Sequence, residues 1–409
     1  MKKVGIIGAG ASGLMAAIEA AGEGAAVTLF EKKDRVGKKI LVTGNGRCNF
    51  TNANISKDYY YTDDDDFVER VLSKFGNSEL LMYFTGLGLL IREKNGYFYP
   101  SCEQASAVLD LLRQALSEKN VDVKTDSNVI SVLNKNDKYV VKLENGDTYE
   151  FDAVIVSTGG KAGLAPKETV NGYDILNKLN HKSTKLYPAL TQIKCDGLNF
   201  KGLSGVKSDC VLYLFADENL IMSQGGELLF TDSGISGIVS FQISHCVAEF
   251  LDNKKKVEVV LDLLPGIEEE NLKAFIVPKM LLHPNQTLEE FFVGLHNKKL
   301  NTEIIKRAGL KPSMKVSDVD KDTLLNAVLS LKEVTVKATD VNGFDKAQVT
   351  GGGILTSEVT DDLESKLHKN LFITGELLNV DGLCGGYNLQ WAFSTGIIAG
   401  RAAGKQEDK

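Results

Sequence analysis

The stretch Val4-Gly-Ile-Ile-Gly8-Ala-Gly10-Ala-Ser-Gly13 decides the fold of this chain. Its apolar run stops at Gly8 and predicts a buried parallel strand, and residues 11–21 then predict a helix. Gly8 permits a tight turn, Gly10 lets the backbone approach a pyrophosphate, and Gly13 allows the helix to pack closely on the strand. The N-terminus of that helix would offer free N–H groups to the phosphates.

A second predicted strand, Ala26 to Phe30, ends in an acidic residue. Glu31 lies close to the offset of about 20 residues at which a ribose-binding carboxylate is expected. The alternative is a plain βαβ unit with a glycine turn, but strand, turn, helix, second strand and acid all occur in order. This context predicts a Rossmann-type dinucleotide site that includes Gly8, Gly10, Ala11, Ser12, Gly13, Glu31 and Lys32.

The other end of the chain carries a complementary segment. Leu371 to Thr374 predicts a short strand, and an apolar helix is expected from Leu389. A nucleotide held by the first motif and a ring system capped by the second is the arrangement of FAD in Rossmann flavoproteins. A helix end at the flavin N1/C2 carbonyl edge would stabilise the reduced anion by about 0.3–1 kcal/mol; the alternative is a Gly-Gly turn before a core helix. The candidates here are Gly375, Glu376, Asp381, Gly385, Gly386, Tyr387, Asn388 and Leu389.

The loop at residues 37–52 supplies further candidates. Its glycines let N–H groups point at an anion, its cations would lie beside a pyrophosphate, and Asn49 and Thr51 suit flavin heteroatoms. The alternative is a helix N-cap loop with incidental charge. Cys48 and Cys384 are expected to be small packing residues near the ring. The candidates in this loop are Lys38, Lys39, Gly44, Gly46, Arg47, Cys48, Asn49 and Thr51, and those in the middle of the chain are Val129, Thr158, Gly159 and Gly160.

Composition narrows the class of protein. The 409 residues predict two or three domains, and a net charge of −7 argues against a nucleic-acid partner. No run approaches the roughly 20 apolar residues of a membrane span. The six cysteines form no C-x-x-C, which favours a cytoplasmic location, and the histidines show no metal spacing. The acidic run Asp63 to Asp66 is expected to be a solvated loop.

The organisation of the chain predicts an interrupted nucleotide fold. Asn145-Gly146 predicts a hairpin turn within a three-stranded meander, and residues 189–262 look rich in short strands with glycine turns. Apolar residues at helical spacing follow, and strands return at Lys332. We therefore expect an FAD-binding domain at 1–187 and 346–409, an inserted β-barrel or sandwich at 188–262 and 331–345, and a helical subdomain at 263–330.

Six segments spread over nearly the whole chain form a further pattern: 37–52, Tyr97-Phe-Tyr-Pro100, 186–190, 226–237, 349–353 and 375–390. They resemble the bacterial YhiN/BaiN-like flavoproteins, a family that includes aminoacetone oxidase. The resemblance implies an α/β fold in which a two-dinucleotide-type FAD-binding domain carries an inserted β-barrel and a helical subdomain. It also implies non-covalent FAD and an oxidoreductase reaction.

The resemblance leaves the reaction open. We expect two-electron hydride transfer at flavin N5, most simply an NAD(P)H-linked reductase of an unsaturated, enone- or steroid-like small molecule. The full nucleotide motif occurs once, so NAD(P)H would visit the flavin transiently. The alternatives are an amine oxidase that uses O₂, a non-catalytic FAD redox sensor, and a flavin-dependent tRNA-modifying protein. Tyr187 and Tyr387 are the candidate proton donors, and the sequence leaves the oligomeric state open.

Overall fold

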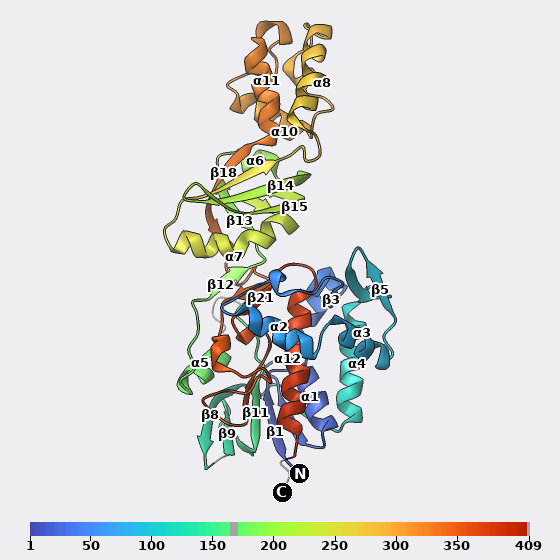
Figure 1. Cartoon of the computed structure of the whole chain (residues 1–409), viewed down its shortest axis with the longest axis vertical. Helices are drawn as coiled ribbons and strands as arrows, with labels where there is room; N and C mark the ends of the chain where they lie inside the picture. Colours follow the sequence, from blue (N-terminus) through green and yellow to red (C-terminus); the bar gives the residue numbers. More distant parts are fainter. Residues whose placement is uncertain (137, 164–170, 407–409) are drawn as a thin grey trace. The chain divides into compact units, whose positions relative to one another are not determined.

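The structure is a computed structural model that describes residues 1–136, 138–163 and 171–406. The chain forms two compact units, each with its own core. Unit 1 is Met1–Tyr187 with Val349–Lys409, and unit 2 is Pro188–Gln348. Figure 1 shows the elements of both units with the labels used below.

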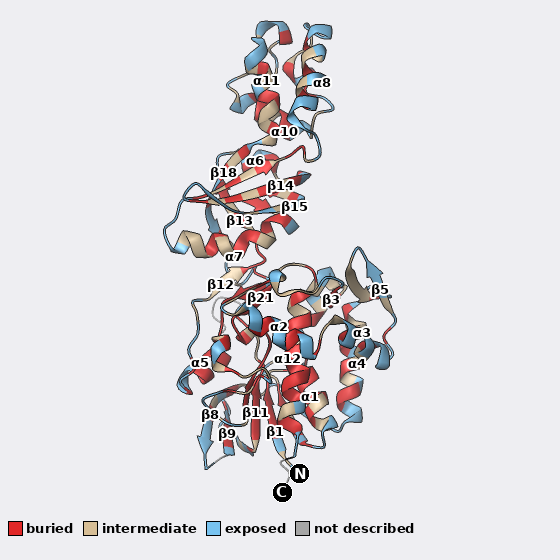
Figure 2. Cartoon of the chain, viewed as in Figure 1, coloured by how far each residue is buried: buried red, intermediate tan, exposed pale blue. Residues whose placement is uncertain are grey.

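Unit 1 is built on a parallel sheet that begins with the predicted strand. β1 (Lys3–Ile7) lies in the middle of the sheet with all but its first residue buried, as its apolar run predicts. Figure 2 shows the buried strands of this sheet beneath the helices. The order is β20 (Leu371–Ile373), β11 (Ala153–Val156), β1, β2 (Ala26–Phe30) and β7 (Asp122–Lys124).

Two helices from opposite ends of the chain pack directly together in unit 1. They are α1 (Ala11–Gly22) and α12 (Tyr387–Gly404), which begins two residues before the expected position. A Cβ added at Gly396 would lie 2.2 Å from the Ser12 carbonyl oxygen, so the two backbones are in contact.

The expected meander is also present: β8 (Val129–Lys135), β9 (Lys138–Leu143) and β10 (Thr148–Phe151), with the Asn145-Gly146 turn between the last two.

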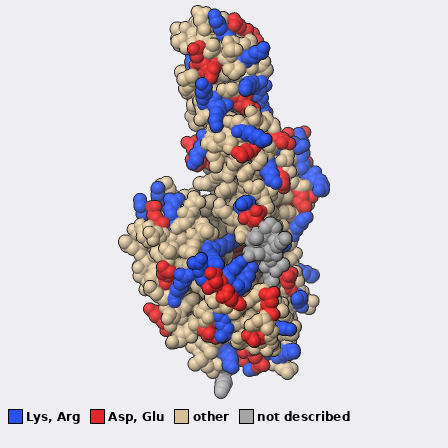
Figure 3. Space-filling model, turned by 180° about the vertical axis from the view of Figure 1, so that it is seen from behind, with Lys and Arg blue, Asp and Glu red and all other residues tan. Residues whose placement is uncertain are grey.

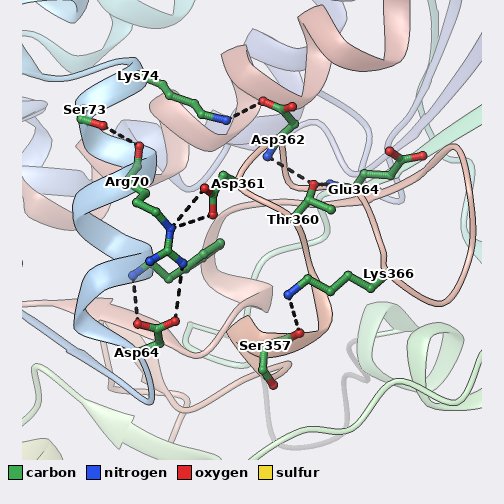
Figure 4. A network of polar contacts seen from close by, with 11 residues as sticks. Asp64, Arg70, Ser73, Lys74, Ser357, Thr360, Asp361, Asp362, Glu364 and Lys366 are labelled. Carbon is green, nitrogen blue, oxygen red and sulfur yellow. Dashed lines mark hydrogen bonds and ion pairs between the residues drawn. The ribbon is translucent and has the colours of Figure 1, made fainter.

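A helix begins within the acidic run, so the prediction of a solvated loop at Asp63 to Asp66 was wrong for Asp65 and Asp66. Asp64 caps α2 (Asp65–Lys74) by accepting a 3.0 Å hydrogen bond from the Phe67 N–H, and carboxylates in the first turn favour the helix dipole. Arg70 of α2 lies between Asp64 and Asp361, 3.0 Å from the latter, and fixes α2 to a loop near the C-terminus (Figure 4).

The remaining elements of unit 1 are mostly short, apart from helices α3 and α4. They are η1 (Ile40–Gly46), β3 (Thr51–Asn52), η2 (Lys57–Tyr59), β4 (Tyr60–Thr62), α3 (Asn77–Gly86), β5 (Ile91–Lys94), β6 (Tyr97–Pro100), α4 (Ala105–Glu118), α5 (Asn171–Lys178), β19 (Val349–Gly351), η5 (Thr356–Glu358), η6 (Gly375–Leu377) and β21 (Val380–Gly382); β12 (Tyr187–Ala189) spans the boundary between the units.

Unit 2 is a closed antiparallel barrel that carries helices. Residues 189–262, predicted to be rich in short strands, supply most strands of the barrel. They also contain a helix that the sequence did not predict, α7 (Ile238–Asp252), whose buried Val239, Ile243 and Val247 recur at helical spacing. The barrel order is β13 (Ile193–Asp196), β16 (Gly234–Ser236), β15 (Asn219–Thr231), β14 (Lys207–Ala216), β17 (Val257–Asp262) and β18 (Val334–Val341).

Helices interrupt the barrel between β17 and β18, where the sequence predicts them. A short helix, α6 (Phe200–Leu203), lies earlier in the unit. The helices of the interruption are α8 (Glu269–Leu282), α9 (Leu288–Phe291), α10 (Lys298–Arg307) and α11 (Lys321–Leu329), with η3 (Val316–Asp318) and η4 (Ser330–Lys332).

Candidate cofactor site

In the turn between β1 and α1, backbone atoms pack closely against Gly8 and Gly13 but leave open space beside Gly10. Gly8 has φ +99°, and a Cβ there would lie 2.6 Å from the Ser157 carbonyl oxygen. A Cβ at Gly13 would lie 1.9 Å from the Gly8 carbonyl oxygen, whereas one at Gly10 would meet no atom within 4 Å. No side chain caps α1, so its first N–H groups face the open side. This turn fits a pyrophosphate, as the sequence predicts.

A pocket lies beside this turn at the carboxyl ends of β1 and β2. Glu31 is fixed in it, since its two carboxylate oxygens accept hydrogen bonds from the N–H groups of Ala9 at 3.0 Å and Lys33 at 2.9 Å. A carboxylate retains further lone pairs for ribose hydroxyls. Six of the predicted residues line this one pocket, whose walls are Ile7, Gly8, Phe30, Glu31, Lys32, Ser127, Asn128, Val129, Thr158 and Gly160.

The loop that ends at Asn52 contacts the loop that precedes α12. The Thr51 hydroxyl is fully buried and donates to the Gln390 side-chain oxygen, and the Asn52 amide donates to the Gly385 carbonyl at 3.0 Å. A Cβ at Gly386 would lie 2.6 Å from the Thr51 carbonyl oxygen. The Thr51 hydroxyl, expected to face the flavin, therefore binds the first turn of α12, whereas Asn52 joins the two loops.

The surroundings of Asn49 show whether a flavin fits where the loop ending at Asn52 meets the start of α12. Its side-chain oxygen is buried and has no hydrogen-bond partner among the described residues. It lies 3.0 Å from the position of a Cβ at Gly386, the N-cap of α12, and no side chain caps that helix. A lone acceptor thus adjoins a row of N–H donors. The pyrimidine edge of oxidised flavin offers the complement, one N3–H donor beside the N1 and C2 carbonyl acceptors, so the residues fit the group.

The cationic side chains of the loop at residues 37–52 are engaged by neighbouring acidic and aromatic side chains. The Lys39 ammonium lies 2.7 Å from one oxygen of Glu376, whose other oxygen accepts the Thr350 N–H at 2.8 Å. Lys38 pairs with Asp34, and the Arg47 guanidinium lies 5.5 Å from the centre of the Tyr99 ring. Figure 3 shows Lys and Arg side chains interspersed with Asp and Glu side chains over the face in view.

Burial disfavours the thiolate form of the two cysteines in the candidate site. Burial raises the pKa of Cys48 to about 12, and it also raises the pKa of Cys384. A thiol with a raised pKa stays protonated at neutral pH and is a poor nucleophile. That both are packing residues near the ring stays a prediction, which the raised pKa values favour.

A group of tyrosines surrounds the loop before α12, and we call Tyr59, Tyr60, Tyr97 and Tyr387 the tyrosine cluster. The Tyr59 and Tyr387 rings stack with centroids 4.8 Å apart, and the Tyr60 hydroxyl donates to the Tyr387 carbonyl at 3.1 Å. A Cβ at Gly385 would lie 3.0 Å from ring carbons of both Tyr97 and Tyr387. Burial raises the pKa of Tyr97 and Tyr387, so both phenols stay protonated.

The sequence identified only Tyr387 of this cluster. Tyr97 belongs to β6, which pairs with β3, and this pairing brings its ring to the candidate site. The one available signal was the run Tyr97-Phe-Tyr-Pro100, which carries the family resemblance but predicts no role for Tyr97 in the site. The other candidate, Tyr187, belongs to β12, where Lys185 lies 5.9 Å from its ring centre; none of the contacts that define the cluster involves it.

The remaining predicted site residues lie in or beside the segments described above. Gly44, Gly46 and Gly159 have positive φ and Asn388 caps the loop at Gly382, while Gly160 adjoins Glu376, Gly375 adjoins Ser12, Asp381 is buried in β21, and Leu389 is half-buried in the first turn of α12.

The described residues contain neither a cluster suited to a metal ion nor a helix suited to span a membrane. No group of three or more His, Cys, Asp or Glu there is arranged to hold a metal ion. No described helix combines the length and the apolar character needed to cross a bilayer.

Known proteins similar in sequence also indicate a Rossmann-type nucleotide site. Residues 2–402 match the family described as HI0933-like protein Rossmann domain. The chain is 37% identical over 409 residues to the 3-dehydro-bile acid delta(4,6)-reductase of Clostridium scindens, covering 99% of this chain and 100% of the relative. It is 28% identical over 411 residues to the ribosomal RNA dihydrouridine synthase of Haemophilus influenzae, covering 98% of each.

Solved structures support the fold. The 3-ketosteroid delta1-dehydrogenase of Sterolibacterium denitrificans is similar with a TM-score of 0.52 and 12% identity, over 99% of this chain and 100% of that one. The 3-ketosteroid-delta4-(5alpha)-dehydrogenase of Rhodococcus jostii gives 0.50 and 15%, over 99% and 97%. At these identities the likeness concerns architecture alone.

Proposed function

Since the chain belongs to the HI0933-like family of FAD-dependent oxidoreductases, we propose that it reduces a carbon–carbon double bond conjugated with a carbonyl group in a steroid-like small molecule. NAD(P)H is the proposed electron donor. The observation that carries this proposal is the 37% identity, over the full length of both chains, to a reductase of an unsaturated bile acid.

The residues of both chain ends would hold the cofactor. The Gly8–Gly10 turn and the first N–H groups of α1 receive the pyrophosphate, and Glu31 receives a ribose. The Asn49 side-chain oxygen and the N-terminus of α12 receive the pyrimidine edge. FAD bound in this way supplies two-electron hydride chemistry. An N–H donor row at this edge favours negative charge on the ring and so favours reduction.

The tyrosine cluster supplies the proton that the reaction needs. Reduction of a conjugated double bond adds a hydride at one carbon and a proton at its neighbour. The phenols of Tyr97 and Tyr387 are protonated at neutral pH because burial raises their pKa. We assign the proton transfer to this pair, with Tyr97 as the more accessible member since Tyr387 is only 6% exposed.

Steady-state turnover tests the proposal. Holoenzyme is mixed without O₂ with NADH or NADPH and a 3-dehydro-bile acid that carries delta(4,6) unsaturation. We expect nicotinamide oxidation that depends on the steroid, and a product that gains two hydrogens per double bond. Nicotinamide oxidation that is unchanged by the steroid would contradict the proposal.

Reduction of uridine in ribosomal RNA is the second candidate. It is favoured by the relative from Haemophilus influenzae, whose name states that activity. The chemistry is related, because the uracil ring also has a double bond conjugated with a carbonyl. The net charge of −7 weighs against a polyanionic substrate. Dihydrouridine formation in ribosomal RNA treated with holoenzyme and NAD(P)H, without steroid turnover, would select this candidate.

A further inference from the structure

One side of the small sheet formed by β3, β6 and β5 carries two aromatic rings next to the loop before α12. Tyr97 and Tyr99 are two residues apart on β6, so their rings lie on the same side of the sheet. Both residues are half-buried, and the neighbouring strand β5 is largely exposed (Figure 2). The Tyr97 ring adjoins Gly385 in the loop before α12. We call Tyr97 and Tyr99 the aromatic face.

A cation lies at the Tyr99 end of the aromatic face. The Arg47 guanidinium lies 5.5 Å from the centre of the Tyr99 ring, within the range of a cation–π contact. Its Nε donates a long hydrogen bond of 3.4 Å to the Gly44 carbonyl. Within the described parts of the chain, no carboxylate pairs with Arg47 and no acceptor takes the N–H groups of its two terminal nitrogens. These N–H groups are therefore available to a ligand.

The other cations on this side of the sheet are placed differently. Arg92 of β5 pairs with Tyr99 across the strands, but Glu103 neutralises it at 3.3 Å. Lys94 lies opposite Tyr97 and is exposed, so water and salt screen its charge. Arg47 combines a half-buried position, an aromatic neighbour and the lack of a counter-charge. An anion gains more from such a cation than from a fully solvated one.

We propose that the aromatic face and Arg47 bind two parts of one ligand, a flat apolar body against the two rings and a carboxylate on the guanidinium. On the proposed function, on which this assignment rests, the substrate is then an acidic steroid and not a neutral one. A guanidinium presents parallel N–H groups that match the two oxygens of a carboxylate. Tyrosine rings offer a large apolar surface to the body of the ligand.

The spacing of these residues sets the length of the ligand. Burial raises the pKa of Tyr99 and the charge of Arg47 opposes this effect, whereas Arg47 does not act on the pKa of Tyr97. Arg47 thus lies toward the Tyr99 end. Tyr99 lies roughly 7 Å along the strand from Tyr97, so a double bond reduced beside Tyr97 and an anion held by Arg47 are roughly 10 Å apart. An elongated molecule of fused rings spans this distance, and a small amino ketone does not.

Calorimetric titration of the oxidised, FAD-loaded chain without an electron donor tests the proposal. The two ligands are a saturated bile acid and its carboxamide, which share one body and differ in charge. We expect the wild type to bind the acid at least about tenfold more tightly than the amide. Raising the ionic strength from about 0.05 M to about 0.5 M should weaken binding of the acid and leave that of the amide unchanged.

Variants identify the cation that is responsible. Arg47→Gln should weaken binding of the acid about tenfold and leave that of the amide unchanged, so the preference disappears. Arg47→Lys keeps the charge without the parallel N–H groups and should retain part of the preference. Tyr99→Ser should weaken both ligands, because both lie against its ring. Lys94→Gln removes an exposed cation from the same side of the sheet and is the matched control, in which the preference should persist.

Three results would overturn the assignment of Arg47. The first is equal binding of acid and amide by the wild type, or a preference that survives in Arg47→Gln. The second is loss of FAD from Arg47→Gln, measured by the ratio of flavin to protein absorbance, which would place the guanidinium on the cofactor. The third is a uridine-containing oligonucleotide that binds through Arg47 more tightly than the acid, which would favour an RNA phosphate.

The binding test does not depend on turnover, because neither ligand contains a double bond to reduce. Acid-selective binding through Arg47 by a chain that reduces no steroid would contradict the proposed function alone. Steroid reduction by a chain that binds acid and amide equally would contradict the role of Arg47 alone.

Discussion

Gly396 of α12 lies so close to Ser12 of α1 that a methyl group at Gly396 would come within 2.2 Å of the Ser12 carbonyl oxygen. The same relation recurs one turn later, where a Cβ at Gly400 would lie 2.5 Å from the Ala16 carbonyl. The two helices therefore run parallel in a fixed register. The N-terminus of α12 projects about two turns, or about 12 Å, beyond that of α1. One helix end thus faces the expected pyrophosphate and the other the expected flavin ring.

Substitution at this contact should disturb cofactor binding from a distance. Gly396→Ala forces the helices apart, and we expect a loss of about 1–3 kcal/mol in the free energy of unfolding together with a lower FAD content. Urea denaturation and the ratio of flavin to protein absorbance measure the two effects. Gly86→Ala is the control, because its Cβ would meet no atom within 4 Å and it should leave both unchanged.

Gly10→Ala should separate cofactor binding from folding. A Cβ at Gly10 enters open space, so the apoprotein should keep its stability. It also enters the space assigned to the pyrophosphate, so the dissociation constant of FAD should rise at least about tenfold, or about 1.4 kcal/mol. Calorimetric titration of apoprotein with FAD measures this. Gly22→Ala, equally open but at the far end of α1, should bind FAD normally; equal affinity in both variants would place the pyrophosphate elsewhere.

Asn49 should influence the redox potential of the flavin. Asn49→Asp keeps an acceptor oxygen but adds negative charge beside the ring edge, which disfavours the reduced anion. A penalty of about 1.4 kcal/mol corresponds to a potential lower by about 30 mV for a two-electron couple. Spectroelectrochemistry measures the shift. Asn145→Asp, in the exposed turn between β9 and β10, adds the same charge away from the site; if both variants shifted equally, the assignment of Asn49 would fail.

Acid should destabilise the chain through a buried histidine. The His181 Nδ1 lies 2.8 Å from Glu358, its Nε2 lies 3.0 Å from the Ser365 hydroxyl, and burial lowers its pKa below 6.5. The unfolded chain then binds the proton more readily than the folded one. Stability is therefore fully present above a pH of about 6.5 and is lost as the pH falls. Urea denaturation near pH 7.5 and near pH 5.5 measures the loss.

A variant that cannot titrate tests the assignment to this residue. His181→Asn should be less stable at neutral pH and should show a smaller change with pH. His296, whose pKa burial also lowers, lies in unit 2, so His296→Asn is the matched comparison. If His181→Asn lost as much stability on acidification as the wild type, another group would be responsible.

The sequence predicted the parts of the site that depend on local chain geometry. The Gly8–Gly13 turn and Glu31 follow from the order of one strand, one helix and the next strand, and the helix after Gly386 follows from its apolar run. α7 was missed because its Ile, Val and Phe residues, flanked by glycine, also suit strands. Asp64 was missed because a helix cap and a solvated acidic loop share the same composition.

Other features depend on pairings between distant segments. Gly396 looks like an ordinary helical glycine until Ser12 is brought against it. Tyr97 joins the site only because β6 pairs with β3, and the Thr51 hydroxyl meets Gln390 across almost the whole chain. No local spacing encodes these contacts, since they arise from the packing of unit 1.

A single-turnover experiment tests the central claim most directly. Holoenzyme is reduced without O₂, excess donor is removed, and a 3-dehydro-bile acid with delta(4,6) unsaturation is added. We predict that the visible flavin absorbance returns in step with formation of one equivalent of a product heavier by two hydrogens. A flavin that stays reduced in the presence of the steroid, yet reoxidises when O₂ or ribosomal RNA is supplied, would contradict the account.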